Sequence, residues 1–257
     1  MPDYVHTASR IAREAGAIIR EGYGRAQQVE HKSAIDLVTE FDKRSEALIL
    51  RELRQAYPGH GFQAEESGHA AGDDYEWLVD PLDGTTNFAH GFPVFSVSLA
   101  LTYRRQLVAG VVYDPLRDEL YTAEAGHGAA LNGSPMQVSA VADLGQALLA
   151  TGFPYDLRTN PQNNFAEFQR FQLRAQAVRR AGSAALDCAW VAAGRLDGYW
   201  EYRINPWDIG AGALMVRESG GRVTDAHASD DFLAQPLAVV SNGLIHDQML
   251  NVLNEPL

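Results

Sequence analysis

The segment Trp77-Leu-Val-Asp80-Pro-Leu-Asp83-Gly-Thr-Thr86-Asn-Phe-Ala-His-Gly91 is the most informative part of this chain. Its apolar half predicts a buried strand that ends at Asp80, because Pro81 has no N–H to donate to a sheet. Asp83 then lies on the following turn, and residues 84–86 offer backbone N–H groups and hydroxyls at a predicted helix start. Such a helix start is a natural seat for phosphate.

The two aspartates in this segment favour a magnesium site. Magnesium is a hard cation that prefers oxygen ligands and completes its octahedron with water and substrate phosphate. Two such ions about 4 Å apart could clamp the attacking and leaving oxygens of an in-line displacement, with Asp83 as the natural bridge between them. Because a bound divalent ion lowers the pKa of its water, the expected nucleophile is a metal-activated water.

Other nucleophiles are not expected. Asp83-Gly-Thr also occurs in the Asp-x-Asp-Gly-Thr motif of phosphatases that form an aspartyl-phosphate, but here Pro81 would occupy the position of the nucleophile. The sequence contains neither a Gly-x-Ser-x-Gly elbow nor a His-Glu-x-x-His pair, so a serine nucleophile and a histidine-zinc site are not expected either. Cys188 lies in an apolar run and is interpreted as a core residue.

Toward the N-terminus, two amphipathic helices are expected. Apolar residues recur with a period near 3.6 from Tyr4 to Gly22. A second helix begins after Thr39, which stands three residues before Asp42 in a variant of the capping pattern, and it stops at Tyr57-Pro58-Gly59.

Downstream of the segment, strands come first, and then strands and helices alternate. Turn residues separate predicted strands at 76–80, 95–103, 106–113 and 119–123, and an Asn132-Gly133 hairpin follows with Met136 to Ser139 as the returning strand. After a boundary near residues 139–145, predicted strands at 147–151 and 198–202 alternate with helices at 164–174, 184–194 and 207–219. We expect an α/β protein with an α+β domain at 1–142 and an α/β domain at 143–257.

Composition bounds the class of protein. The 257 residues are 46% hydrophobic, which is enough to bury a large core. The formal net charge of −12 disfavours a broad nucleic-acid-binding surface and is consistent with clustered carboxylates that hold a divalent ion. No apolar run approaches the length of a membrane-spanning helix, and the single cysteine excludes an intrachain disulfide. We therefore expect a cytoplasmic protein.

The order and spacing of several motifs resemble those of the inositol monophosphatase family, a group of lithium-sensitive, magnesium-dependent phosphatases. The resemblance covers essentially the whole chain. The motifs that carry it, besides Asp80-Pro-Leu-Asp83-Gly-Thr-Thr, are Asp36-Leu-Val-Thr39-Glu-Phe-Asp42, Glu65-Glu66-Ser67, Gly126-His-Gly-Ala-Ala-Leu-Asn132-Gly133, Arg180-Ala-Gly182-Ser183-Ala184-Ala185 and Trp207-Asp208-Ile-Gly-Ala-Gly212.

This resemblance implies a set of site residues. Two or three Mg²⁺ ions would be bound by Glu65, Asp80, Asp83, Asp208 and the carbonyl oxygen of Leu82. Gly84 and Thr85 would hold the phosphate, and Thr85, with Asp42 behind it, would orient the nucleophilic water. The hydroxyls of the substrate would meet Glu201, Asp208 and the segment of Gly182, Ser183 and Ala184. The family fold is a layered αβαβα sandwich, usually in a homodimer, and Ala64 replaces the glycine that commonly precedes the paired glutamates.

Several of these residues also have a purely structural interpretation. Asp208 and Asp42 could simply cap the helices that follow them. Glu65 and Glu66 could be solvated charges in a loop. If they belong to the site, we expect Glu66 to support the metal ligands without binding the metal itself. Gly182-Ser183 could be only the turn into the next helix, and Arg179-Arg180 is interpreted as a surface pair.

The expected function is hydrolysis of a phosphate monoester, with myo-inositol monophosphate as the first substrate to try and with inhibition by lithium. The alternatives keep the chemistry but change the substrate to fructose 1,6-bisphosphate, 3′-phosphoadenosine 5′-phosphate or histidinol phosphate. A further possibility is a regulatory protein that binds the transcription machinery. Glu201 favours a polyhydroxylated ring, because a carboxylate accepts hydrogen bonds from hydroxyls.

Overall fold

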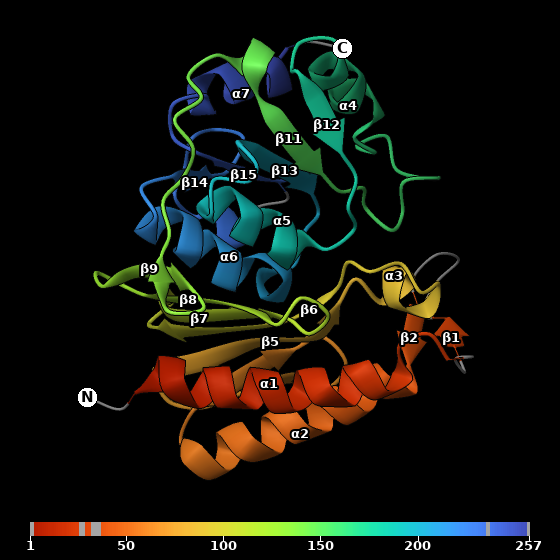
Figure 1. The fold of residues 1–257 in the computed structure, drawn as a ribbon, viewed down its shortest axis with the longest axis vertical. Helices are drawn as coiled ribbons and strands as arrows, with labels where there is room; N and C mark the ends of the chain where they lie inside the picture. Colours follow the sequence, from red (N-terminus) through yellow and green to blue (C-terminus); the bar gives the residue numbers. More distant parts are fainter. Residues whose placement is uncertain (1–2, 26–28, 32–36, 235–236, 256–257) are drawn as a thin grey trace.

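Helices and sheets alternate in five layers in the computed structural model, which describes residues 3–25, 29–31, 37–234 and 237–255 (Figure 1). Two long helices lie outside a large sheet, two more lie between this sheet and a smaller one, and two short helices cover the outer face of the smaller sheet. The αβαβα sandwich expected from the sequence is confirmed. The six helices of these layers are α1 (Tyr4–Gly22), α2 (Glu40–Ala56), α5 (Ala184–Ala192), α6 (Pro206–Glu218), α4 (Phe165–Gln172) and α7 (His246–Leu253).

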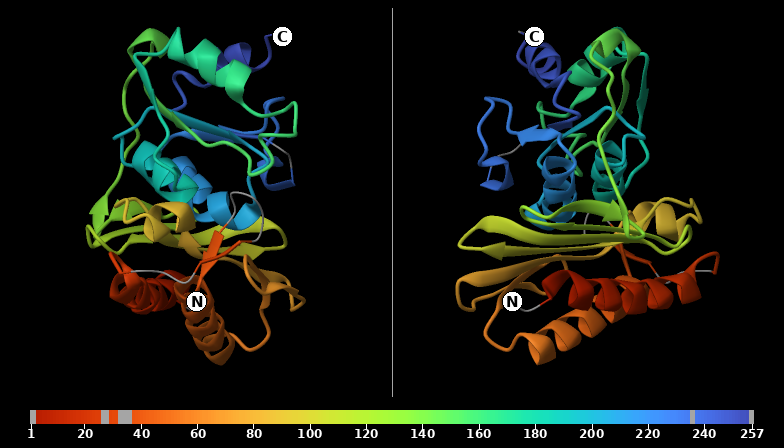
Figure 2. Two further views of the ribbon diagram at one scale, coloured as in Figure 1. Left: turned by 90° about the vertical axis from the view of Figure 1, so that its right-hand side faces the viewer. Right: turned by 60° about the vertical axis from the view of Figure 1, so that its left-hand side comes forward.

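The outer helices form where the sequence predicts them. The side chain of Asp3 accepts a hydrogen bond from the backbone N–H of His6 at the start of α1. At the start of α2, Thr39 and Asp42 form a complete capping box. The apolar stripes of both helices, with Ile19 and Leu53 fully buried, pack on one face of the large sheet. Figure 2 shows both helices on that face from two further sides.

The large sheet has eight strands within the described residues, in the order β10-β9-β8-β7-β6-β5-β3-β4. Its β3 and β5 are parallel and the other pairs are antiparallel. The sequence did not predict β3 and β4. The strands are β3 (Gly61–Ala64), β4 (Gly68–Ala70), β5 (Tyr75–Asp83), β6 (Ser96–Tyr103), β7 (Gln106–Asp114), β8 (Glu119–Glu124), β9 (Gly128–Leu131) and β10 (Ser134–Pro135).

Strand β5 does not end at Asp80, and that prediction is wrong. The strand continues to Asp83, and its register with β6 shifts between the pairs Asp80↔Ser98 and Asp83↔Ser96. Three steps on β5 therefore match two steps on β6, which is a β-bulge. The bulge accommodates Pro81, whose missing N–H would otherwise leave a gap in the ladder. Asp80 stands at the start of the bulge and Asp83 at its end.

The returning strand of the last hairpin is also shorter and earlier than predicted. Asn132-Gly133 forms the turn, but pairing resumes at once at Ser134–Pro135, and residues 136–139 are not a strand. The backbone N–H of Val138 instead donates to the carbonyl oxygen of Ser219, at the end of α6. The chain thus passes from the large sheet to the inner helices over these residues.

The smaller sheet has the order β12-β11-β13-β15-β14, with β11 parallel to both of its neighbours and the other pairs antiparallel. The predicted helices and strands of this half are confirmed within two residues at each end. The division at residues 142 and 143 stays a prediction, since α5 and α6 also pack on the large sheet. The strands are β11 (Leu148–Thr151), β12 (Ala177–Arg179), β13 (Gly198–Tyr202), β14 (Arg222–Thr224) and β15 (Leu237–Ser241).

The remaining elements are short. They are β1 (Val29–His31), β2 (Leu37–Thr39), α3 (Thr85–Ala89) and the 3₁₀ turns η1 (Leu144–Gln146) and η2 (Phe232–Ala234). Asp36, the first residue of one motif, lies outside the described residues. No helix among the described residues is long and apolar enough to cross a membrane.

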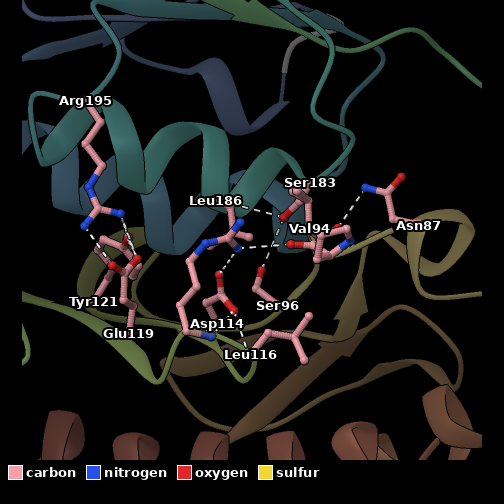
Figure 3. A network of polar contacts seen from close by, with 12 residues as sticks. Asn87, Val94, Ser96, Asp114, Leu116, Glu119, Tyr121, Ser183, Leu186 and Arg195 are labelled. Atoms are coloured by element: carbon pink, nitrogen blue, oxygen red, sulfur yellow. Dashed lines mark hydrogen bonds and ion pairs between the residues drawn. The ribbon is translucent and has the colours of Figure 1, made fainter. Parts of the chain in front are cut away.

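Polar contacts tie the two halves of the sequence together (Figure 3). Arg195, just after α5, contacts both carboxyl oxygens of Glu119 on β8 at 2.7 and 2.8 Å, and it donates to the hydroxyl of Tyr121. On the other side of α5, the side-chain amide of Asn87 donates to the carbonyl oxygen of Ala181 at 2.8 Å. Helix α5 is therefore anchored at both ends, to β8 of the large sheet after its C-terminus and to α3 (Thr85–Ala89) before its N-terminus.

His246 makes the stability of the fold sensitive to pH. It is fully buried, with Nε2 at 2.9 Å from the hydroxyl oxygen of Thr224 and Nδ1 at 2.8 Å from that of Ser241. Thr224 already donates to a carbonyl oxygen, so it accepts from Nε2–H, and Ser241 donates to Nδ1 of a neutral ring. Burial, with Arg222 nearby, lowers the pKa of His246 to about 4.

We predict that acid destabilises the protein through this histidine. As the pH falls below about 6.5, His246 becomes protonated in the unfolded chain, whereas in the folded chain it stays neutral until about pH 4. The stability that the neutral histidine contributes is thus present above pH 6.5 and is lost between pH 6.5 and 4. Urea unfolding should show that wild type loses about 2 kcal/mol more than His246→Gln between pH 7 and pH 5. The exposed His127→Gln serves as control, and equal losses in all three proteins would contradict the prediction.

Candidate active site

One cavity collects nearly all of the predicted site residues. It has a volume of about 710 Å³ including its open mouth, and it lies where the end of β5 and α3 meet the first turns of α5 and α6 and the end of β13. The predicted site residues that line it are Glu65, Asp80, Leu82, Asp83, Gly84, Thr85, Gly182, Ser183, Ala184, Glu201 and Asp208. The exception is Asp42, which reaches the cavity through Thr85.

The bulge of β5 positions the first group of oxygens. Asp80 is buried, and one of its carboxyl oxygens accepts the backbone N–H of Leu82 at 3.0 Å. The hydroxyl of Thr85 lies 3.0 Å from the carbonyl oxygen of Leu82 and 2.8 Å from Asp42 Oδ1. This hydroxyl has one hydrogen to donate, so it serves only one of the two acceptors at a time.

Asp42 caps a helix and also contacts the wall of the cavity, so the capping interpretation is confirmed and the catalytic role stays a prediction. Its Oδ2 accepts from the N–H and the hydroxyl of Thr39 at 2.8 and 2.5 Å, which caps α2. Its Oδ1 faces Thr85. Burial raises the pKa of Asp42, and the hydrogen bonds from Thr39 and Thr85 oppose that rise. A single buried carboxyl group therefore links the end of a helix to the wall of the cavity.

Asp83 links the two halves of the chain. Its Oδ2 accepts from the hydroxyl of Ser183 at 2.5 Å and from the N–H of Ala185 at 2.9 Å, and its Oδ1 lies 3.3 Å from the N–H of Ala184. The N-terminus of α5 thus points at a carboxylate from β5, which is a favourable arrangement for a negative charge. Burial raises the pKa of Asp83 to about 6, and these hydrogen bonds limit the rise.

Asp208 is likewise both a capping residue and part of the cavity. Asn205 caps α6, and Asp208 completes the capping box by accepting the N–H of Asn205 at 2.9 Å. Glu65 is half-buried and lines the cavity, so the interpretation as a solvated surface charge does not hold for it. Its neighbour Glu66 lies outside the cavity lining, and its N–H donates to the buried Glu46.

The four carboxylates make the cavity strongly electronegative. Burial raises the pKa of Asp80 well above its usual value, and the charges of Glu65, Asp83 and Asp208 raise it further. Burial also raises the pKa of Asp208, and the charges of Glu65 and Asp83 raise it further. Groups that repel one another in a partly desolvated space gain most from a shared cation.

The donor set fits a hard divalent ion. It consists of carboxylate oxygens and the peptide carbonyl of Leu82, the kind of ligand that magnesium prefers. Among the described residues, however, no three carboxylate, histidine or cysteine side chains already have the spacing that holds a metal. The hydrogen bonds of Asp80 and Asp208 occupy one carboxyl oxygen each. Each of these two carboxylates therefore keeps its second oxygen for a cation.

Several further residues line the cavity, and three of them that were not predicted from the sequence bear on its chemistry. Gly152 and Asp187 line it, and so does Arg180, which was interpreted as a surface residue. A signal was present for Asp187, because it is an acid within the otherwise apolar run of α5. Nothing local marks Gly152.

Comparisons with known proteins agree with this geometry. The model of the inositol monophosphatase family matches residues 2–255. The chain is 43% identical to an inositol-1-monophosphatase of Mesorhizobium japonicum, over 96% of this chain and 95% of that protein. It is 44% identical to a protein of Pseudomonas aeruginosa named Nus factor SuhB, over 94% of this chain and 92% of that protein.

Solved structures give the same answer for the fold. An inositol monophosphatase from Anabaena (Nostoc) superposes with a TM-score of 0.89 at 43% identity, covering 97% of this chain and 94% of that one. An IMPase/NADP phosphatase complexed with Mg²⁺ and phosphate superposes with a TM-score of 0.83 at 26% identity, covering 95% and 92%. This chain therefore belongs to the inositol monophosphatase family and is an inositol-1-monophosphatase-like phosphoric monoester hydrolase.

Proposed function

We propose that this protein hydrolyses myo-inositol monophosphate to inositol and phosphate in a magnesium-dependent reaction. The observation that carries the proposal is a single cavity in which four carboxylates and the Gly84-Thr85 turn face Glu201. In this arrangement the phosphate, the metal and the alcohol part of the substrate would each contact a different part of the cavity lining. When bound, two or three Mg²⁺ ions would supply positive charge for the ester and would acidify the attacking water. The ligands would be Glu65, Asp80, Asp83, Asp208 and the carbonyl oxygen of Leu82.

Thr85 and Asp42 would place the attacking water. When the hydroxyl of Thr85 donates to Asp42, its lone pairs remain to accept a hydrogen from the water. Asp42 would keep the hydroxyl in this orientation, because both of its own oxygens are fixed by hydrogen bonds. The water is thereby oriented and its proton is drawn toward Thr85.

Gly84 would bring the backbone close to the phosphate. Its φ of 95° lies in the left-handed region that favours glycine. An added Cβ would lie 2.9 Å from the carbonyl oxygen of Val94 and 3.1 Å from that of Gly182. No other residue fits between these two carbonyl groups, so the turn presents its N–H groups without a side chain in the way.

Glu201 would accept hydrogen bonds from the hydroxyls of the inositol ring. The hydroxyl of Tyr199 donates to its Oε2, which orients the carboxyl group. The carboxyl group also lies against Gly152, where an added Cβ would come within 1.9 to 2.2 Å of its atoms. Gly152 therefore leaves the space that Glu201 occupies.

A regulatory role and three further substrates compete with this proposal, and they differ in what supports them. The name Nus factor SuhB of the Pseudomonas aeruginosa relative supports a second function, a regulatory role with the transcription machinery. Rescue of a deletion phenotype by a catalytically inactive variant would favour that role over catalysis. Fructose 1,6-bisphosphate, 3′-phosphoadenosine 5′-phosphate and histidinol phosphate stay candidates for a substrate panel. The homodimer and the cytoplasmic location also stay predictions.

We predict that Asp83→Asn lowers kcat for inositol 1-phosphate by roughly 100-fold or more, because the variant loses a charge shared by the metal site and the N-terminus of α5. Phosphate release would be measured across a magnesium titration. The control is Asp230→Asn, an exposed aspartate that does not line the cavity, and it should keep wild-type activity. Magnesium-independent turnover, or an unaffected Asp83→Asn enzyme, would sink the proposal.

We predict that Gly152→Ala raises KM for inositol 1-phosphate by ~10-fold, since its methyl group displaces the carboxyl group of Glu201 and one charged hydrogen bond is lost. Steady-state kinetics would give KM and kcat separately. Gly145→Ala is the control, because its added Cβ would lie no closer than 3.3 Å to the side chain of Asp143 and 3.7 Å to the carbonyl oxygen of Arg174. An unchanged KM would remove Glu201 from the binding site.

We predict that lithium inhibits the enzyme, because Li⁺ is similar to Mg²⁺ in size but carries half its charge. The rate of phosphate release would be measured at saturating magnesium with lithium chloride, using sodium chloride at equal concentration as the control for ionic strength. Full activity at tens of millimolar lithium would contradict this prediction.

A further inference from the structure

Asp187, in the first turn of α5, has a buried carboxyl group that the proposed chemistry does not use. The residue is 1% exposed and lines the same cavity as Glu201. Its Oδ1 has no hydrogen-bond partner among the described residues. A buried carboxyl oxygen without a partner destabilises a fold, so it calls for an explanation.

Capping of α5 does not explain this carboxyl group. The N-terminal N–H groups of the helix already have acceptors, since the hydroxyl of Ser183 takes that of Leu186 and Asp83 takes those of Ala184 and Ala185. The N–H of Asp187 itself donates to the carbonyl oxygen of Ser183. An acid near the start of a helix interacts favourably with its dipole, but here no N–H group is left for it.

Asp187 also cannot move away from the cavity. Helix α5 packs against α6, where an added Cβ on Gly212 would lie 2.3 Å from the Cβ of Cys188. Arg195 and Asn87 secure the two ends of the helix. Burial raises the pKa of Asp187 well above its usual value, the charges of Asp83 and Glu201 raise it further, and Arg180 opposes them. The helix therefore holds an acidic group in an unfavourable place.

We propose that Asp187 binds a hydroxyl of the alcohol part of the substrate and that, together with Glu201, it selects phosphate esters of polyhydroxylated alcohols. The inference rests on the proposed function and deepens it. Glu201 is oriented by Tyr199, whereas the unpartnered oxygen of Asp187 stays without a protein donor until a hydroxyl supplies one. Two carboxyl groups on one wall suit neighbouring hydroxyls of one ring, which an ester without hydroxyls cannot offer.

This role has a signature in stability. A structural carboxyl group would leave the protein less stable when it is removed, but an unpartnered one lowers stability while it is present. Asp187→Leu removes both oxygens and keeps most of the volume, so its Tm should rise by ~2 °C or more. Asp187→Asn, which keeps the shape, provides a second variant in case leucine does not fit.

The experiment compares two substrates in the magnesium-saturated enzyme, myo-inositol 1-phosphate and phenyl phosphate, which has no hydroxyl on its ring. In Asp187→Leu, kcat/KM for the inositol ester should fall at least ~10-fold, while that for phenyl phosphate stays within about twofold. Ser219→Ala is the matched control. Its hydroxyl oxygen also has no partner among the described residues, but Ser219 lies at the end of α6, outside the cavity.

The outcomes separate this inference from the proposed function. An equal loss on both substrates, no loss on either, or a lower Tm in both variants would overturn the role of Asp187 in an otherwise active enzyme. A wild-type protein that hydrolyses phenyl phosphate but not inositol 1-phosphate would refute the proposed substrate, and the inference with it. A selective loss on the inositol ester with an unchanged or higher Tm supports the inference.

Discussion

The contact between Asp83 and the first turn of α5 is the constraint on which the site depends. The aspartate comes from a bulge in the large sheet, and its acceptors are satisfied by a hydroxyl and backbone N–H groups of the other half of the chain. The cavity exists only because these two parts meet there. The same contact fixes the start of α5, and with it the positions of Gly182, Ser183 and Asp187 in the lining of the cavity.

The rest of the fold holds repelling charges together. Four carboxylates share one cavity, and burial together with their mutual repulsion raises the pKa values of Asp80 and Asp208. Such a cluster would separate if its supports were soft. The supports are rigid, because α5 and α6 are packed closely at Gly212 and are enclosed by two sheets. The apolar layers thus provide the stability that the polar site lacks.

Local patterns predicted the elements whose signals are local. The limits of α1 and of the strand Gly198–Tyr202 matched, because apolar periodicity and flanking turn residues define them within a few positions. Predictions failed where a contact with a residue distant in the sequence determines the local structure. Pro81 sits in a bulge whose register depends on β6, and residues 136–139 follow a contact with the end of α6. Gly152 matters only through Glu201, 49 positions later, so no local signal could reveal it.

The separation in sequence between Asp83 and Ser183 has a consequence during synthesis. The two residues are 100 positions apart, so a ribosome that adds 5 to 20 residues per second needs roughly 5 to 20 s after Asp83 to synthesise Ser183. During that interval Asp83 would lack its hydrogen-bond donors from α5. Hydrolytic competence therefore arises only after α5 and α6 have been synthesised, and a truncated translation product that stops before α5 cannot be a partial enzyme.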